Sequence, residues 1–215
     1  MPYDHVIAAG DHLVRLAYLQ GMRDPMLVWN DDANASLRKA RPDPAVLSVG
    51  DKVHVPDGPP WIFEGLATGR EHTVVVDLAV PWIRIRLQHP SREPRSGKLC
   101  RVAFLDGGTE QAKVFETDSD GLVEIEIGPF TDVVEIEIDE EHYRLKVARL
   151  DPQDTNAGLR QRLENLGYDP GPVTGKADEY ALRSAVEEFQ QDHGLTVDGF
   201  AGEKTQRKLA ELHGA

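Results

Sequence analysis

The chain has 215 residues, of which 40% are hydrophobic and 28% are charged, and its formal net charge is −13 at pH 7. This length predicts more than one domain, and the composition is typical of folded globular proteins rather than disordered ones. A surface this negative repels phosphate backbones, so we expect no nucleic-acid partner.

The single cysteine, Cys100, excludes an intrachain disulfide. The sequence has no apolar run of the roughly 18 residues that a membrane span requires, so we expect no membrane insertion. The first residues, MPYDHVIAAGDHLVRL, lack the basic stretch and apolar core of an ordinary secretory signal. We therefore expect synthesis in the cytoplasm, and any action outside it requires another export route.

Residues 1–57 form the first predicted module, which ends at the Pro/Gly-rich stretch VPDGPPW. Its pattern predicts a strand, two helices and a second strand. Asp11 is the predicted N-cap of the first helix, whose buried face is formed by apolar residues from Leu13 onward. A longer charged segment, 31–48, separates the second helix from the last strand.

Three short patterns in this module resemble a lysin motif (LysM), a small βααβ module that binds glycans containing N-acetylglucosamine. His12 replaces Thr in the Gly-Asp-Thr-Leu entry, and Val49 replaces Pro in the Pro-Gly exit before the last strand. An asparagine usually ends the second helix region, and Asn30 stands there. The resemblance implies a glycan groove between the start of the first helix and the loop before the last strand. The residues implied in binding are Gly10, Asp11, His12, Leu13, Asn30 and Gly50.

Residues 58–69 are a predicted linker, and residues 70–150 are a predicted antiparallel β-sandwich. Alternating apolar and polar residues mark several of its strands. The predicted strands are HTVVVDLAV (72–80), WIRIRLQ, KLCRVAFL, GLVEIEIG, VVEIEID and HYRLKVARL. Asp-Gly turns at 106–108 and 118–121 join them. The block resembles Ig-like or prealbumin-like modules in which a Thr-Asp-x-Asp-Gly turn connects two strands.

Charges alternate along four of these strands, with glutamates at 124–126 and 135–137 and basic residues at 84–86 and 144–146. Two acidic strands paired directly would place like charges opposite each other, which is destabilising. We therefore predict that basic strands neighbour the acidic ones. The resulting face is interpreted as a solvated, salt-bridged surface; a cation site and a docking face for a basic partner are the alternatives.

The stretch ETDSDG (116–121) has acids at positions 1, 3 and 5 and a glycine at position 6, as a calcium loop does. Position 12, where a calcium loop has a glutamate, is Ile127 within an alternating strand. The stretch is therefore interpreted as a β-turn, and we expect no metal or cofactor.

Residues 151–215 form a predicted three-helix domain. Asp154 or Thr155 is the expected N-cap of its first helix, which Gly167 ends. Two further helices follow, and each inter-helix stretch contains a glycine turn, so the block is a faint internal repeat. The whole chain is thus predicted to be a multidomain α+β protein.

This block resembles the peptidoglycan-binding domain found beside many bacterial cell-wall hydrolases. The matching residues are Leu159, Leu163, Leu166, Gly167, Tyr168, Gly171, Val173, Gly175, Phe189, Gln190, Gly194, Leu195, Asp198, Gly199, Gly202, Thr205 and Leu209. The first turn, at 174–180, departs from the family's Asp-Gly-x-x-Gly-x-x-Thr pattern, whereas the second turn keeps it.

The resemblance implies binding near the two turns, with Tyr168 or Phe200 packing against the sugar or stem peptide. The implied residues are Tyr168, Gly175, Asp198, Gly199, Phe200, Gly202 and Thr205. We expect structural roles first: Gly199 adopts a conformation that side chains oppose, and Asp198 hydrogen-bonds its own turn. Gly202 is expected to permit close approach at the helix entry, and Thr205 to satisfy first-turn amides.

No catalytic constellation is evident, so we expect a protein that is not an enzyme. The histidines are scattered, and His193 and His213 are expected at helix C-termini, where positive charge is favourable. Cys100 lies in a strand pattern and is interpreted as a buried structural thiol. The consecutive acids at 139–141 indicate a turn rather than a glycosidase pair.

These resemblances imply a bacterial peptidoglycan-binding protein whose ligand is either the glycan or the stem peptide. The order of the modules resembles that of accessory proteins of contractile injection machines, including type VI secretion systems. That likeness implies secretion-machine or tail proteins as further partners, and action in the periplasm or cell wall after export. The competing interpretation is a structural adaptor in which both wall-binding modules dock proteins. A peptidoglycan hydrolase is the third interpretation.

Overall fold

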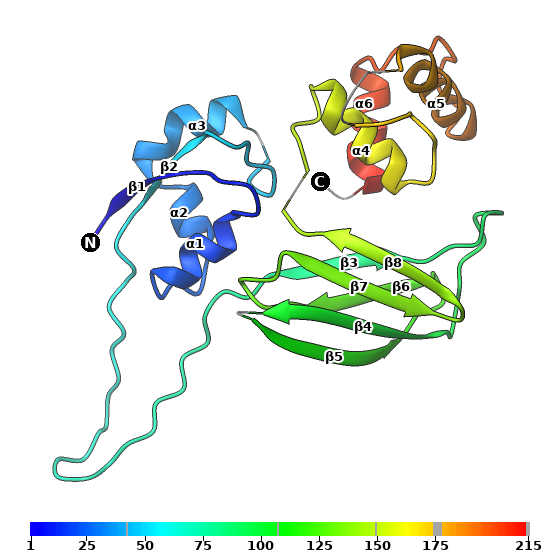
Figure 1. Cartoon of the computed structure of the whole chain (residues 1–215). Helices are drawn as coiled ribbons and strands as arrows, with labels where there is room; N and C mark the ends of the chain where they lie inside the picture. The colour runs from blue at the N-terminus through cyan, green and yellow to red at the C-terminus, as the bar shows by residue number, and fades with distance from the viewer. Residues whose placement is uncertain (42, 107, 149, 174–177, 214–215) are drawn as a thin grey trace. The chain divides into compact units, whose positions relative to one another are not determined.

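A computed structural model of the chain describes residues 1–41, 43–106, 108–148, 150–173 and 178–213 (Figure 1). The protein combines helices with antiparallel sheets and has a helical C-terminal region. It divides into two compact units. One comprises Met1–Pro44 and Val49–Ala148, and the other comprises Ala45–Ser48 and Arg149–Ala215.

The N-terminal part places two strands beside a group of short helices. The elements are β1 (Tyr3–Val6), α1 (Leu13–Leu19), α2 (Met26–Trp29), the 3₁₀ helix η1 (Asp32–Asn34), α3 (Ala35–Ala40) and β2 (Lys52–Val55). The two strands pair antiparallel, from Tyr3 opposite Val55 to Val6 opposite Lys52. The charged segment predicted at 31–48 therefore contains helical structure that the sequence pattern did not indicate.

The predicted cap of α1 was wrong by one residue. His12, not Asp11, is the N-cap, and its Nδ1 accepts a hydrogen bond from the Arg15 amide at 3.2 Å. The Asp11 carboxylate lies instead 2.7 Å from His5 Nε2 and accepts the Ala8 amide at 2.9 Å. The Asp11 carboxylate therefore binds a strand residue and a loop amide instead of capping α1. The spacing of the sequence indicates neither contact.

Residues 56–81, all of which the structure describes, contain no helix or strand. The strand predicted at 72–80 was therefore wrong, although the run TVVVD has high β-propensity. Val75 is 79% exposed, so this run has no packing surface to hold it as a strand. The predicted strand is contacted near its two ends: His72 Nε2 lies 2.8 Å from the Ala67 carbonyl oxygen, and the Ala79 amide donates to the Met22 carbonyl at 3.1 Å.

The middle region contains a two-stranded and a four-stranded antiparallel sheet, ordered β3-β6 and β5-β4-β7-β8 (Figure 1). The strands are β3 (Trp82–Arg86), β4 (Leu99–Asp106), β5 (Thr109–Glu116), β6 (Leu122–Glu126), β7 (Val133–Ile138) and β8 (Glu141–Lys146). Sequence reasoning missed β5, which is exposed along nearly its whole length and so lacks an apolar alternation.

One apolar core is shared by the two sheets. Its fully buried members alternate along β4, β6 and β7 with outward-facing polar residues. The core residues are Leu87, Cys100, Val102, Phe104, Val123, Ile125, Ile127, Val134, Ile136 and Ile138. Cys100 is buried here as predicted, and burial raises the pKa of its thiol.

The predicted alternation of acidic and basic strands is confirmed. Arg84 lies opposite Glu124 between β3 and β6, and Arg144 lies opposite Glu135 between β7 and β8. The Arg84 Nε to Glu124 Oε1 distance is 2.7 Å. These side chains are more than half exposed, so each pair contributes about 1 kcal/mol or less and mainly favours the correct strand register.

The stretch at 116–121 forms the predicted turn. The Asp118 carboxylate accepts hydrogen bonds from the Asp120 and Leu122 amides, both at 2.8 Å. Gly121 has a φ of 72°, and a Cβ there would lie 2.4 Å from the Leu87 carbonyl oxygen. Only glycine fits this position.

Three helices form the C-terminal unit (yellow to red in Figure 1): α4 (Asn156–Asn165), α5 (Glu179–Asp192) and α6 (Glu203–His213). Thr155 is the N-cap of α4, as predicted, and accepts the Gly158 amide at 3.0 Å. The buried core consists of Leu159, Leu163, Tyr168, Leu182, Ala185, Val186, Phe189 and Leu209. Across the described parts of the chain, every helix is too short or too polar to cross a bilayer.

Both C-terminal histidines lie at helix ends, as predicted. His193 is the C-cap of α5, and His213 is the last described residue of α6. Burial, assisted by the nearby charge of Arg162, lowers the pKa of His213. The expected benefit of positive charge at this helix end is therefore reduced, because the ring favours its neutral form.

Candidate functional site

The second inter-helix turn of the C-terminal unit is held by one buried side chain, Gln190 of α5, which is 1% exposed. Its Oε1 accepts the amides of Asp198 and Gly199 at 2.9 and 3.0 Å. Its Nε2 lies 2.8 Å from Asp198 Oδ1 and 2.9 Å from the Phe200 carbonyl oxygen. A glutamine supplies both donors and acceptors, so one side chain satisfies several groups of this turn.

The turn also closes on itself. Asp198 Oδ1 accepts the Phe200 amide at 2.8 Å, which confirms the predicted local bond. The hydrogen bond from Gln190 is the main reason that the pKa of Asp198 is lowered, so this carboxylate is ionised. Gly199 has a φ of 70°, the left-handed conformation that was predicted for it.

Two predicted details of this turn were wrong. A Cβ added to Gly202 would meet no atom within 4 Å, so this glycine is not required for close approach. Thr205 does not satisfy first-turn amides; its Oγ1 accepts a bond from Gln190 Nε2 at 3.1 Å. The buried amide of Gln190 on α5 thus reaches the first turn of α6.

The fixed turn presents an aromatic ring to solvent. Phe200 is 78% exposed, although its backbone amide and carbonyl are both held within the Asp198–Gln190 network. Val197 beside it is also exposed. An apolar ring on an ordered backbone can bind the apolar face of a ligand at a small entropic cost.

The first inter-helix loop is held by a different chemical group. Arg160 of α4 is buried, donates through Nη1 to the Pro170 carbonyl, and donates through Nη2 to the Asp178 carbonyl at 2.8 Å. Arg160 follows Leu159 as Gln190 follows Phe189, so the two buried polar groups occupy similar places in the repeat. Gly175, predicted as a binding residue, lies outside the described residues.

Tyr168 does not face solvent. Its ring is buried and packs edge-to-face on Phe189 at a centroid distance of 5.6 Å, and its hydroxyl donates to Asp192 Oδ2 at 3.0 Å. The prediction that this ring packs against a ligand is therefore not supported by its position. Its role in the described structure is to join α4 to the end of α5.

The structure brings together the two loops predicted to border a groove in the N-terminal part. The Gly50 amide donates to the Ile7 carbonyl, and the Ile7 amide donates to the Asp51 carbonyl, both at 2.9 Å. Gly10 and Gly50 both have positive φ, at 93° and 94°. Asn30 lies apart from this pair of loops in the chain, as the exposed C-cap of α2.

The polar groups of this N-terminal pair of loops are largely committed to the protein itself. Asp11 contacts His5, the Ala8 amide and Arg15. Leu13 is buried in the core. His12 caps α1, and burial together with the charge of Arg15 lowers its pKa to about 4. A ligand at these loops would find the Asp11 carboxylate already engaged by groups of the protein.

Sequence reasoning missed Asn34, which is buried and joins the helices to β2. Its Nδ2 donates to the Val28 and His54 carbonyls at 2.7 and 2.8 Å, and its Oδ1 accepts the His54 amide at 2.8 Å. The polar run around it gave no signal of burial.

Gln190 was recognised as part of a motif but not as a site residue, although its place after a buried phenylalanine was the available signal.

One of the comparisons with known proteins found a match, and it falls in the C-terminal helical region. Residues 157–209 match the model of a family described as "Putative peptidoglycan binding domain". This range contains α4 from its second residue, α5, the Gln190-held turn and most of α6. Neither the curated proteins nor the solved structures that were compared with the chain gave a match.

Proposed function

We propose that the protein binds peptidoglycan through its C-terminal unit and that the turn carrying Phe200 forms part of the binding surface. The observation that carries this proposal is the family match at 157–209, which contains a turn whose backbone is fixed and whose aromatic ring is exposed. Ordered backbone and exposed apolar surface are the features that a small recognition site needs.

In this proposal, the Phe200 ring packs against an apolar face of the sugar or a stem-peptide side chain. The ionised Asp198 carboxylate adds negative charge beside that ring and favours a ligand that carries an amino group. Gln190 takes no part in direct contact. It positions the turn, so its effect on affinity is indirect.

The finer features of the protein are part of the same proposal. A LysM-like N-terminal fold is supported by the antiparallel pairing of β1 with β2 and by the helices α1 and α2 that follow β1; η1 and α3 are additional to a βααβ module. A β-sandwich in the middle region is supported by the core that the two sheets share. We further propose a non-catalytic protein that reaches the wall as an accessory component of a contractile injection machine, on the basis of the order of modules.

A second function is favoured for the N-terminal part, which we propose to be an adaptor that docks a protein. Its support is that the Asp11 carboxylate and His12 Nδ1 are engaged within the protein. If this proposal holds, substituting Asn30 or Val49 at the surface leaves wall binding unchanged. Loss of wall binding in either variant would favour a glycan groove here.

The main proposal is tested by sedimentation of the intact protein with purified peptidoglycan sacculi. We expect retention of the full chain and loss of retention when residues 154–215 are deleted. The supernatant is examined for soluble muropeptides in the same tubes, because their release would contradict the non-catalytic proposal. Retention by the deletion variant would assign binding to the rest of the chain instead.

A further inference from the structure

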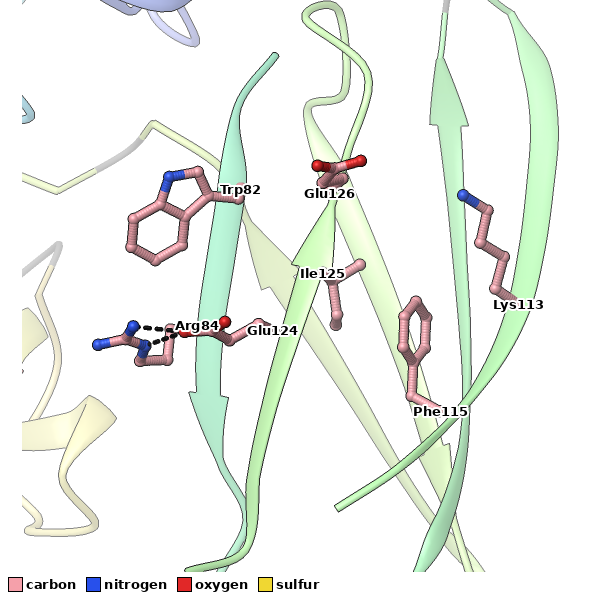
Figure 2. Close-up of a pocket in the computed structure, with 7 residues that line it drawn as sticks. All are labelled: Trp82, Arg84, Lys113, Phe115, Glu124, Ile125 and Glu126. Atoms are coloured by element: carbon pink, nitrogen blue, oxygen red, sulfur yellow. Dashed lines mark hydrogen bonds and ion pairs between the residues drawn. The ribbon is translucent and has the colours of Figure 1, made fainter. Parts of the chain in front are cut away.

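The two-stranded sheet leaves one side of β6 open. Strand β6 pairs with β3 only among the described strands, and β5 is likewise the end strand of its own sheet. A hollow of about 570 Å³ is bordered by β3, β6 and β5 and lined by Trp82, Arg84, Lys113, Phe115, Glu124, Ile125 and Glu126 (Figure 2). The edge of β6 therefore adjoins a space that side chains of the protein do not fill.

The floor of this hollow is an uncovered part of the inner face of β5. Lys113 and Phe115 pair across β4 with Val102 and Cys100, which are core residues, so all four side chains point to the same face. Phe115 is only half-buried and Lys113 is exposed. In Figure 2, Ile125 and Phe115 extend into the space between β6 and β5. This is the arrangement of a sheet that lacks one strand.

The chain itself contains a segment with the chemistry of that strand. Residues 73–78, TVVVDL, have high β-propensity, yet none of them makes a hydrogen bond within the described structure. Val74, Val75 and Val76 are all exposed. Six residues in extended form span about 20 Å, which suffices to run along the five-residue strand β6.

Connectivity prevents the segment from reaching this edge in its own molecule. The Ala79 amide is fixed on the Met22 carbonyl, and the Pro81 carbonyl accepts the Ile127 amide as the chain enters β3. From Pro81 the chain continues along the opposite side of β6, and only Val80 separates the two fixed points. The segment of a second copy has no such restriction.

The hollow carries two bases and two acids, and one base, Arg84, is paired with Glu124, so Lys113 is the base that an acid of the segment could meet. Lys113 forms no ion pair within the described residues, and the segment carries one acid, Asp77. A lysine pointing inward on an end strand normally discourages pairing with unrelated chains, and an acid on the incoming strand removes that penalty. Apolar valines would meanwhile cover Phe115, which is only half-buried.

We propose that two copies of this chain exchange these segments, so that residues 73–78 of each copy pair with the open edge of β6 in the other. The exchange is isologous, since each copy gives one strand and receives one, and it therefore closes as a dimer. It buries the exposed valines and satisfies backbone groups on both strands. The inference does not depend on the ligand of the C-terminal unit.

The test is the mass of the full chain by analytical ultracentrifugation, combined with hydrogen exchange. We expect a dimer in which the amides of 73–78 and of β6 exchange slowly. Val75→Pro removes a donor and should give a monomer. Ile62→Pro is the matched control, because Ile62 is 78% exposed in the same strandless stretch, and it should remain a dimer.

Substitutions that reverse the charges of Lys113 and Asp77 test whether these two side chains form the proposed contact. Lys113→Glu and Asp77→Lys should each weaken the dimer, and the protein carrying both substitutions should recover it. A wild-type monomer at about 100 µM, where micromolar association would be complete, overturns the proposal. A dimer that Val75→Pro and Lys113→Glu leave intact also overturns it, as does protection of β6 only on adding soluble peptidoglycan fragments.

Discussion

Substituting Gln190 by leucine tests the claim that one buried amide holds the turn carrying Phe200. Leucine has nearly the same size and keeps the apolar packing on the α5 face, so it removes the polar contacts with little loss of volume. The amides of Asp198 and Gly199 and the hydroxyl of Thr205 then lose their partner. Gln191, which is exposed beside it, provides the matched control Gln191→Leu.

The expected magnitude follows from the groups left without a partner. A buried donor or acceptor that loses its partner costs about 1–3 kcal/mol, but these groups are only partly buried and can admit water. We therefore expect the turn to lose about 2–4 kcal/mol of local stability. Because 1.4 kcal/mol corresponds to a factor of ten, the amide of Phe200 should exchange about 30- to 700-fold faster.

Hydrogen exchange followed by mass spectrometry on the full chain measures this change directly. In Gln190→Leu, protection should fall in the peptide covering 197–202, while the peptides of α4 and of the β-strands keep their rates. Gln191→Leu should match the wild type throughout. If the protection of 197–202 falls by less than about fivefold, the turn is held by its own Asp198 bonds and the reasoning about Gln190 is wrong.

Three further changes test other parts of the structure. Asn34→Ala leaves three backbone groups without a partner and should lower the stability of the N-terminal part by about 2–4 kcal/mol, measured by urea unfolding with tryptophan fluorescence; an effect below about 1 kcal/mol would contradict its bridging role. Because the pKa of His12 is lowered to about 4, the unfolded chain binds this proton first, so stability should be full above pH 6.5 and fall by about 3 kcal/mol as pH drops to 4. His12→Gln should flatten that slope, and an unchanged slope would refute the assignment. Gly199→Ala should reduce thermal stability by about 1 kcal/mol or more, since its φ is positive, whereas Gly202→Ala, which has open space, should lie within about 0.5 kcal/mol of the wild type.

Sequence patterns predicted those strands that bury one face and expose the other. The alternating residues of β4, β6 and β7 were recognised because each strand places one face on a core. The acidic and basic strands were placed side by side because like charges repel. Strand β5 was missed for the same reason. Its inner face is largely uncovered, so polar residues such as Lys113 and Gln111 are tolerated there. The sequence of β5 therefore lacks the alternation of apolar and polar residues that marks a strand.

The failures at 72–80 and at α1 have tertiary causes. The valine run has the propensity of a strand, but a strand also needs a neighbour, and local sequence does not say whether one is present. At α1 both Asp11 and His12 are chemically able to cap. The position of His5 on β1 decides between them, because it draws the Asp11 carboxylate away from the helix.

Within the candidate site, sequence reasoning predicted the backbone of the second turn better than its support. Gly199 and Asp198 were assigned correctly, since a positive φ and a local side-chain bond are properties of the turn itself. The roles of Thr205 and Tyr168 depend on which helices pack together, so their burial became evident only in the folded unit.

The most direct measurement of the central claim compares the binding of Phe200→Ala and Tyr180→Ala with that of the intact protein on purified sacculi. Both rings belong to the C-terminal unit and are exposed to similar extents, 78% and 82%, but only Phe200 lies on the Gln190-held turn. Burying a phenylalanine contributes about 1.5–3 kcal/mol, so Phe200→Ala should bind about tenfold or more weakly and Tyr180→Ala should bind as the wild type does. Equal binding by all three proteins, or no retention of the intact chain at low salt, would contradict the account.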